Sequence, residues 1–211
     1  MSTPDPAQVR TRAAHHEAAH VAAGYALGLE ISGPATIVPA DGFTGNCFIG
    51  TTLRVDGNGQ RPPTPMLYRA EVTSLVLTYL AGQHGAWQAS EVPAAPLDGA
   101  ALGTYERKLE ASARRIAEFT ATDDPRPQDD YHRAQDLLIA YFGPDQPGLA
   151  YMELEVLDAE AGHLVAKLRR PITLLARELL AHDHLEADRL VELCRRNVAT
   201  PLLSQRQTER A

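Results

Sequence analysis

The stretch HHEAAHVAAGYALG, residues 15–28, places three histidines and one glutamate at the start of a segment of small and apolar residues. It belongs to a run that begins with Asp5, an expected N-cap, and Pro6 at the first helical position, and that has no helix breaker before Gly28. The sequence therefore predicts one helix over residues 6–27. Such a helix is compatible either with a buried structural element or with the active-site helix of a zinc hydrolase.

His16, Glu17 and His20 form the pattern HExxH. Side chains four positions apart lie one turn above each other on the same helix face, so both imidazoles can point at one metal ion. Glu17, one step around the helix, can take a proton from a metal-bound water, whose pKa zinc lowers to about 7, and pass it to the leaving amine. The pattern predicts a Zn2+ ion bound by His16 and His20, with Glu17 as general base. His15 points elsewhere and is expected to be a surface neighbour.

A catalytic zinc site needs a third protein ligand and an open position for water. In the predicted helix over residues 129–143, Asp130 shares a face with apolar residues, whereas Asp129 shares its face with Arg133. We therefore expect Asp130 to face the core as a ligand, or to cap the helix and pair with an arginine, and Asp129 to face water. His84, inside an apolar helix, stays open as an alternative ligand. The histidines expected to be exposed are His132, His182 and His184.

Helices dominate the rest of the chain. Two β-branched runs at residues 35–40 and 45–55, separated by the turn signal DGFTG, predict a pair of short antiparallel strands. The other predicted helices cover residues 66–90, 102–119, 129–143, 151–170, 171–182 and 185–196. The predicted fold class is mainly α, with a small antiparallel β element after the HExxH helix. We expect residues 1–211 to form a single domain that ends in a flexible tail over 198–211.

The composition, 44% hydrophobic and 22% charged, is that of an ordinary globular protein. A net charge of −7 without a basic block argues against a nucleic-acid partner. No segment is long and apolar enough to span a membrane, and the N-terminus lacks the apolar core of a signal peptide. Cys47 and Cys194 lie far apart and outside any CxxC pair, which predicts reduced thiols in a cytoplasmic protein. The oligomeric state stays open.

Six segments carry a further signal: HEAAHVAAGYALG, ATIVPA, GNCFIG, LAGQHGAWQA, QDDYHRAQDLL and RPITLLARELLAHDHLEADRLVEL. These segments occur in the same order as in the zinc peptidase domain of the FtsH-type ATP-dependent proteases. The chain resembles that domain over most of residues 10–197. This resemblance implies a mostly helical fold, with His16, His20 and Asp130 as zinc ligands and Glu17 as base. It also implies that a strand beside the site aligns the substrate by backbone pairing. The residues of that strand here are Gly45, Asn46, Cys47, Phe48 and Ile49.

The chain also departs from that family. We expect it to lack the ATPase module and the membrane anchor, since residues 1–211 contain no counterpart of either. Ala19 replaces a usual glycine, and Ala86 and Trp87 replace acidic residues. Residues 89–127 form an insertion that could be a lid, a docking arm or a surface excursion. The resemblance thus implies a stand-alone, ATP-independent zinc metalloendopeptidase that acts on a peptide or protein substrate. Two alternatives are a non-catalytic binding or regulatory module with a structural zinc site, and a metal hydrolase that acts on other amides.

Overall fold

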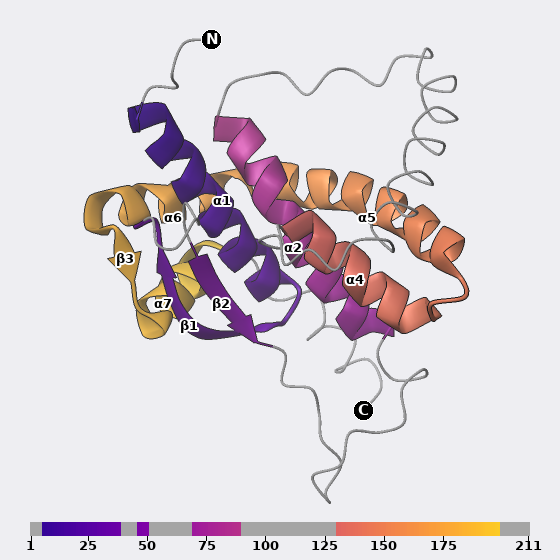
Figure 1. Ribbon diagram of the computed structural model, residues 1–211. Coiled ribbons are helices and arrows are strands. Elements are labelled where there is room, and N and C mark those ends of the chain that lie inside the picture. The colour runs from indigo at the N-terminus through magenta and orange to yellow at the C-terminus, as the bar shows by residue number, and fades with distance from the viewer. Residues whose placement is uncertain (1–5, 39–45, 51–68, 90–129, 199–211) are drawn as a thin grey trace, which may run out of the picture.

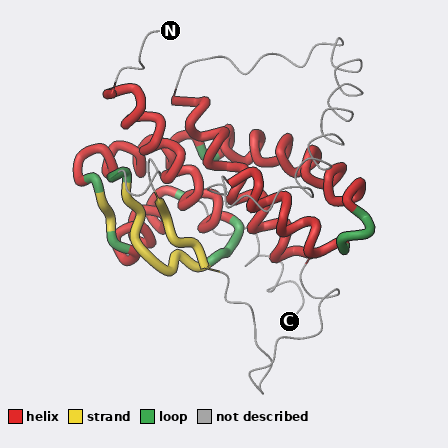
Figure 2. Tube along the Cα trace, in the orientation of Figure 1, coloured by secondary structure: helices red, strands yellow, loops and turns green. Residues whose placement is uncertain are grey.

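The computed structural model describes residues 6–38, 46–50, 69–89 and 130–198, and these form six helices and three strands (Figure 1). The helices are α1 (Pro6–Ala26), α2 (Arg69–Ala89), α4 (Asp130–Phe142), α5 (Pro147–Lys167), α6 (Arg169–His182) and α7 (Ala187–Asn197). The strands are β1 (Glu30–Thr36), β2 (Asn46–Gly50) and β3 (His184–Leu185). Figure 2 shows the strands gathered at one side of a mostly helical molecule. The predicted fold class, mainly α with a small antiparallel β element after the first helix, is confirmed.

The first helix follows the sequence prediction to within one residue at its end. α1 begins at Pro6 and ends at Ala26, and Gly28 then adopts a φ of 77°, a left-handed conformation that glycine takes readily. The helix is buried on several sides, because it packs against α2, α6 and the sheet. Its buried apolar side chains are all alanine except Val21, which lets these neighbours approach its backbone closely.

Glycine on α2 brings that helix especially close to α1. A Cβ atom added at Gly85 would lie 2.5 Å from the Cβ of Ala19 and 2.6 Å from the backbone oxygen of His15. No side chain larger than hydrogen fits there unless the two helices move apart. The separation of α1 and α2 is therefore set by glycine against alanine, and in Figure 1 the two helices run side by side.

The sheet has the strand order β2-β1-β3 with antiparallel pairing throughout. The strand expected over residues 35–40 was misplaced, because β1 begins at Glu30 and runs through Gly33 and Pro34. Its pairing with β2 is irregular between Ile31 and Ala35, and such an irregularity accommodates a proline that has no N–H to donate. β3 was not predicted: the sequence placed Leu185 at the start of a helix over 185–196, whereas α7 begins at Ala187, and a strand of two residues carries no periodic signal.

Helix boundaries near the C-terminus also differ from the prediction. α5 begins at Pro147, four residues before the expected start, because proline suits the first turn of a helix. α6 begins at Arg169 and contains Pro171 in its first turn, so the break expected between residues 170 and 171 lies slightly earlier. The predicted helix over 102–119, the tail after residue 198 and all of the insertion except Ala89 lie outside the described residues.

Buried apolar side chains form two clusters. One joins α1 and the sheet to α6 and α7, and the other joins α2 to α4 and α5. The contact between α1 and α2 lies where the two clusters meet, and buried polar residues concentrate there: Glu17, His20, Ser74 and Thr78. None of the described helices is long and apolar enough to cross a membrane.

Replacement of Gly85 tests the close approach of α1 and α2. We expect Gly85→Ala to lower the free energy of unfolding by about 1–3 kcal/mol, because the new methyl group overpacks the contact with Ala19. This loss would outweigh the gain in helix propensity of about 1 kcal/mol. Gly148 on α5 is the matched control, since a Cβ there meets nothing within 4 Å. Urea unfolding measures both variants, and equal stability of the two would contradict the close packing.

Candidate functional site

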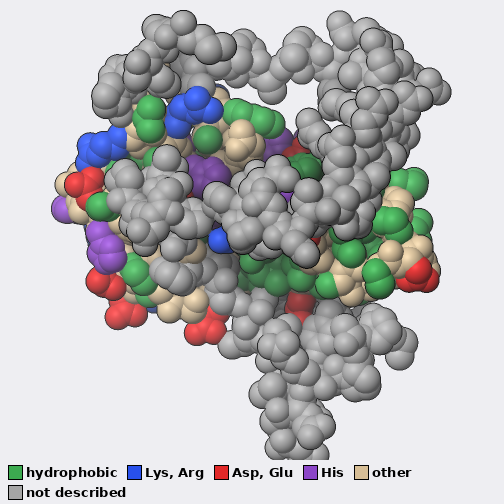
Figure 3. Space-filling view, viewed as in Figure 1, with side chains coloured by type: hydrophobic (Ala, Val, Ile, Leu, Met, Phe, Trp, Pro, Cys, Tyr) green, Lys and Arg blue, Asp and Glu red, His purple; other side chains and the backbone are tan. Residues whose placement is uncertain are grey.

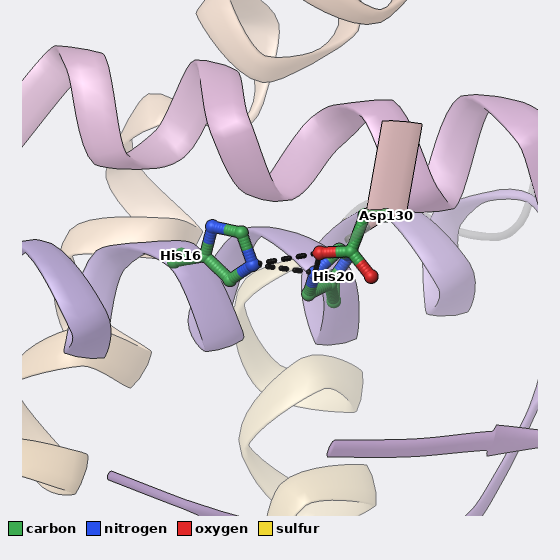
Figure 4. A group of neighbouring side chains, drawn as sticks. All are labelled: His16, His20 and Asp130. Carbon is green, nitrogen blue, oxygen red and sulfur yellow. Dashed lines mark hydrogen bonds and ion pairs between the residues drawn. The ribbon is translucent and has the colours of Figure 1, made fainter. Parts of the chain in front are cut away.

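Side chains from α1 and α4 converge at one point (Figure 4). His16 and His20 lie one turn apart on α1, and Asp130 is the first residue of α4. The Nε2 atoms of the two imidazoles are 3.0 Å apart, and Asp130 Oδ2 lies 2.9 Å from the first and 3.0 Å from the second. Among the described residues these three form a group whose ligand atoms are close enough together to hold one metal ion. The structure thus brings together the three residues expected to be ligands.

The tautomer of His20 is fixed by α2. Its Nδ1 lies 2.7 Å from the carbonyl oxygen of Thr78, which only accepts, so Nδ1–H is the donor. In a neutral His20 the Nε2 atom therefore carries a lone pair. That lone pair faces the carboxylate of Asp130 at 3.0 Å. A proton on His16 Nε2 would leave His20 Nε2 and Asp130 Oδ2 as two acceptors in contact, so this contact becomes favourable only when a proton or a metal cation lies between them.

The pKa shifts of His20 and Asp130 also indicate that positive charge is favourable between these two residues. Burial lowers the pKa of His20, but the hydrogen bond to Asp130 and the charges of Asp130 and Glu17 outweigh it and raise the pKa to about 9. Burial raises the pKa of Asp130, but hydrogen bonds from His16 and His20 outweigh it and hold the pKa well below its usual range. The surroundings therefore favour a carboxylate together with added positive charge.

The donor set fits zinc. Two imidazole nitrogens and one carboxylate oxygen are common zinc ligands at about 2.0–2.1 Å, and tetrahedral ligands at that distance lie about 3.3 Å apart. The observed separations of 2.9–3.0 Å are only slightly shorter. The donation from His20 Nδ1 to a backbone carbonyl is also typical of zinc-bound histidine.

Gly82 on α2 leaves room for the two rings. A Cβ atom at this position would lie 2.4 Å from Nε2 of His20 and 2.8 Å from Cε1 of His16. Its role was missed at the sequence level. The sequence does show a glycine inside a predicted helix. Such a glycine lowers helix stability and often marks a place where another part of the protein packs closely against the helix.

Glu17 is buried beside this cluster. Burial raises the pKa of its carboxyl group, and the charges of His20 and His16 and a hydrogen bond with the thiol of Cys47 offset the rise only in part. Cys47 lies on β2 and is half-buried. Its contact with Glu17 was not predicted, because the sequence placed Cys47 only on the strand expected to bind substrate.

That strand is an edge strand in the described part of the sheet. β2 covers Asn46–Gly50 and pairs with β1, which separates it from β3. Gly45 lies outside the described residues. The role in substrate alignment that the resemblance implies for Asn46, Cys47, Phe48 and Ile49 stays a prediction.

The alternative third ligand, His84, lies elsewhere. Its Nε2 is 3.0 Å from Asp158 Oδ1 on α5, and its ring packs edge-on against Trp87. An arginine was also expected as a partner of Asp130, and Arg133 lies near it: its Nη1 is 3.8 Å from Asp130 Oδ1, farther than either histidine nitrogen is from Oδ2. Asp129 lies outside the described residues.

The remaining histidines are not part of the cluster. His182 and His184 are exposed as predicted, and Figure 3 shows histidine and acidic side chains together at the edge formed by β3 and α7. His15 is half-buried rather than on the surface, since α2 packs over its backbone, and its ring bonds within α1 to the carbonyl of Thr11. His132 is half-buried rather than exposed, because α2 and α5 both pack against α4.

Comparisons with known proteins identify no family. No protein-family model matches the chain, and no curated protein matches it either.

The proton on His20 tests the geometry directly. We expect spectra of the protein with ¹⁵N-labelled histidine to show a slowly exchanging proton on Nδ1 of His20, because this atom donates to the buried carbonyl of Thr78. His20→Gln assigns the signal, and the exposed His184 is the rapidly exchanging reference. Gly82→Ala should displace the ring and remove the protection. An unprotonated Nδ1 in the wild-type protein would contradict this arrangement.

Proposed function

We propose that this protein is a zinc-dependent peptidase that hydrolyses peptide bonds in a peptide or protein substrate, as its resemblance to the peptidase domain of the FtsH-type proteases implies. The observation that carries the proposal is the convergence of His16, His20 and Asp130 next to the buried carboxylate of Glu17. When bound by these three residues, zinc would polarise the scissile carbonyl and lower the pKa of the attacking water.

Glu17 would move the proton. As the oxygen of water bonds to the carbonyl carbon, the Glu17 carboxylate takes the proton that the water loses. It then gives that proton to the amide nitrogen as the C–N bond breaks, so the carboxylate is regenerated. Burial supports this role because it raises the pKa of Glu17 and makes the carboxylate a better base than an exposed one.

The edge strand favours a peptide as the substrate. The outer edge of β2 has no strand partner among the described residues, so its backbone can pair with an extended chain. β2 also packs against α1, the helix that carries Glu17. Pairing of this kind suits a peptide better than an amide without a peptide backbone.

The number of donors favours a catalytic site over a structural one. Structural zinc sites usually have four protein ligands, whereas catalytic sites have three and keep one position open. In the described part of the chain the group has three donors, and His16 and Asp130 are only half-buried, so the site is accessible. The thiols of Cys47 and Cys194 are both free, which fits a reducing compartment such as the cytoplasm.

Glu17→Gln tests this function. In the zinc-loaded full chain we expect the variant to retain stoichiometric zinc and to cleave an unfolded protein substrate about 10²–10⁴-fold more slowly, because the general base is lost. His16→Ala should lose both zinc and cleavage. His84→Ala, whose histidine pairs with Asp158, is the matched control and should keep both.

Equal cleavage by the wild type and Glu17→Gln would contradict the proposed role of Glu17. Stoichiometric zinc in a wild-type protein that cleaves neither peptides nor unfolded proteins would instead favour a non-catalytic module.

A further inference from the structure

The side chain of Cys47 reaches the candidate general base from the sheet. Cys47 is paired with Ala35 of β1, and residues directly opposite each other on neighbouring strands point to the same face. Ala35 is fully buried in the cluster around α1, and Cys47 packs against the same cluster. This face of the sheet therefore meets α1, and there the thiol of Cys47 is hydrogen-bonded to the carboxylate of Glu17.

The thiol is the donor in this contact. An ionised carboxylate only accepts hydrogen bonds, so the hydrogen comes from sulfur. Burial raises the pKa of the Cys47 thiol well above its usual value, and the negative charge of Glu17 raises it further. These surroundings favour the thiol over the thiolate, which makes Cys47 a poor nucleophile and an S–H donor.

A weak donor suits a carboxylate that has to accept a proton. Glu17 is a long side chain in a buried position, where its carboxylate needs a partner and its rotamer has to be held. An arginine or lysine would hold it but would also strongly lower its basicity. An S–H group holds the carboxylate with one weak bond and leaves its other lone pairs available.

We propose that Cys47 is a positioning residue for Glu17: its S–H donates to the buried carboxylate and holds it in the orientation from which it accepts a proton. This inference deepens the proposed function and rests on it, because the positioning matters for catalysis only if Glu17 is the base. Nothing in the HExxH pattern requires a cysteine, so Cys47 is a property of this chain's own strand.

The hydrogen bond itself is tested by infrared spectroscopy, which needs neither zinc nor activity. The chain has two cysteines, and Cys194 lies in an apolar cluster, where it serves as an internal reference. We expect the S–H stretching band of Cys47, assigned by its loss in Cys47→Ala, to lie below that of Cys194. In Glu17→Gln, which replaces the carboxylate with a weaker acceptor, the Cys47 band should move upward while the Cys194 band stays in place. A Cys47 band that does not respond to Glu17→Gln would overturn the proposal.

Kinetics then test the positioning. We expect Cys47→Ala to lower kcat about tenfold, the order that loss of one hydrogen bond produces, with little change in KM or zinc content. Cys47→Ser, which restores a donor at the same place, should recover most of kcat. Cys194→Ala is the control for removal of a buried thiol and should leave kcat unchanged.

Three outcomes distinguish the positioning role of Cys47 from a packing role and from failure of the proposed function. Loss of zinc in Cys47→Ala, or a kcat that Cys47→Ser does not restore, would show a packing role and overturn the positioning role. If the wild-type protein cleaves no peptide, the proposed function fails. The infrared response to Glu17→Gln would then decide alone whether Cys47 orients this side chain.

Discussion

Close contact between α1 and α2 is the constraint on which the rest of the structure depends. Alanines on α1 and glycines on α2 let the two backbones approach, and Gly82 leaves space for imidazoles that any larger residue would displace. α2 also supplies the carbonyl of Thr78 that fixes the ring of His20. Because α4 packs against α2, the start of α4 brings Asp130 to the histidines of α1. One helix thus positions residues that are more than a hundred positions apart.

The electrostatics of the site follow from this packing. Burial of His20 and Glu17 would be costly without partners, and each has one on a different element: Thr78 on α2 for the imidazole and Cys47 on β2 for the carboxylate. Asp130 opposite the two histidines creates a place where added positive charge is favourable. The side formed by His16 and Asp130 is partly exposed to solvent, and the proposed metal and substrate would enter there.

Residue spacing and apolar periodicity in the sequence predicted the features that depend on a single helix. Spacing of four residues predicted that His16 and His20 share one helix face, and apolar periodicity predicted that Asp130 points inward, where it lies beside both histidines. Contacts between different helices and strands leave no comparable pattern in the sequence, so they were not predicted. The role of Gly82, the bond between Cys47 and Glu17, and strand β3 depend on which elements become neighbours. The prediction placed β1 too late in the chain, because a Gly-Pro pair usually ends a strand. In the structure an irregular pairing with β2 accommodates this Gly-Pro pair within β1.

Anomalous diffraction at the zinc absorption edge, from crystals of the zinc-loaded full chain, tests most directly whether this packing builds a metal site. The predicted result is one strong peak about 2.0–2.1 Å from Nε2 of His16, Nε2 of His20 and a carboxylate oxygen of Asp130. A peak at His84 and Asp158 instead, or no peak between α1 and α4 in protein that contains stoichiometric zinc, would contradict it.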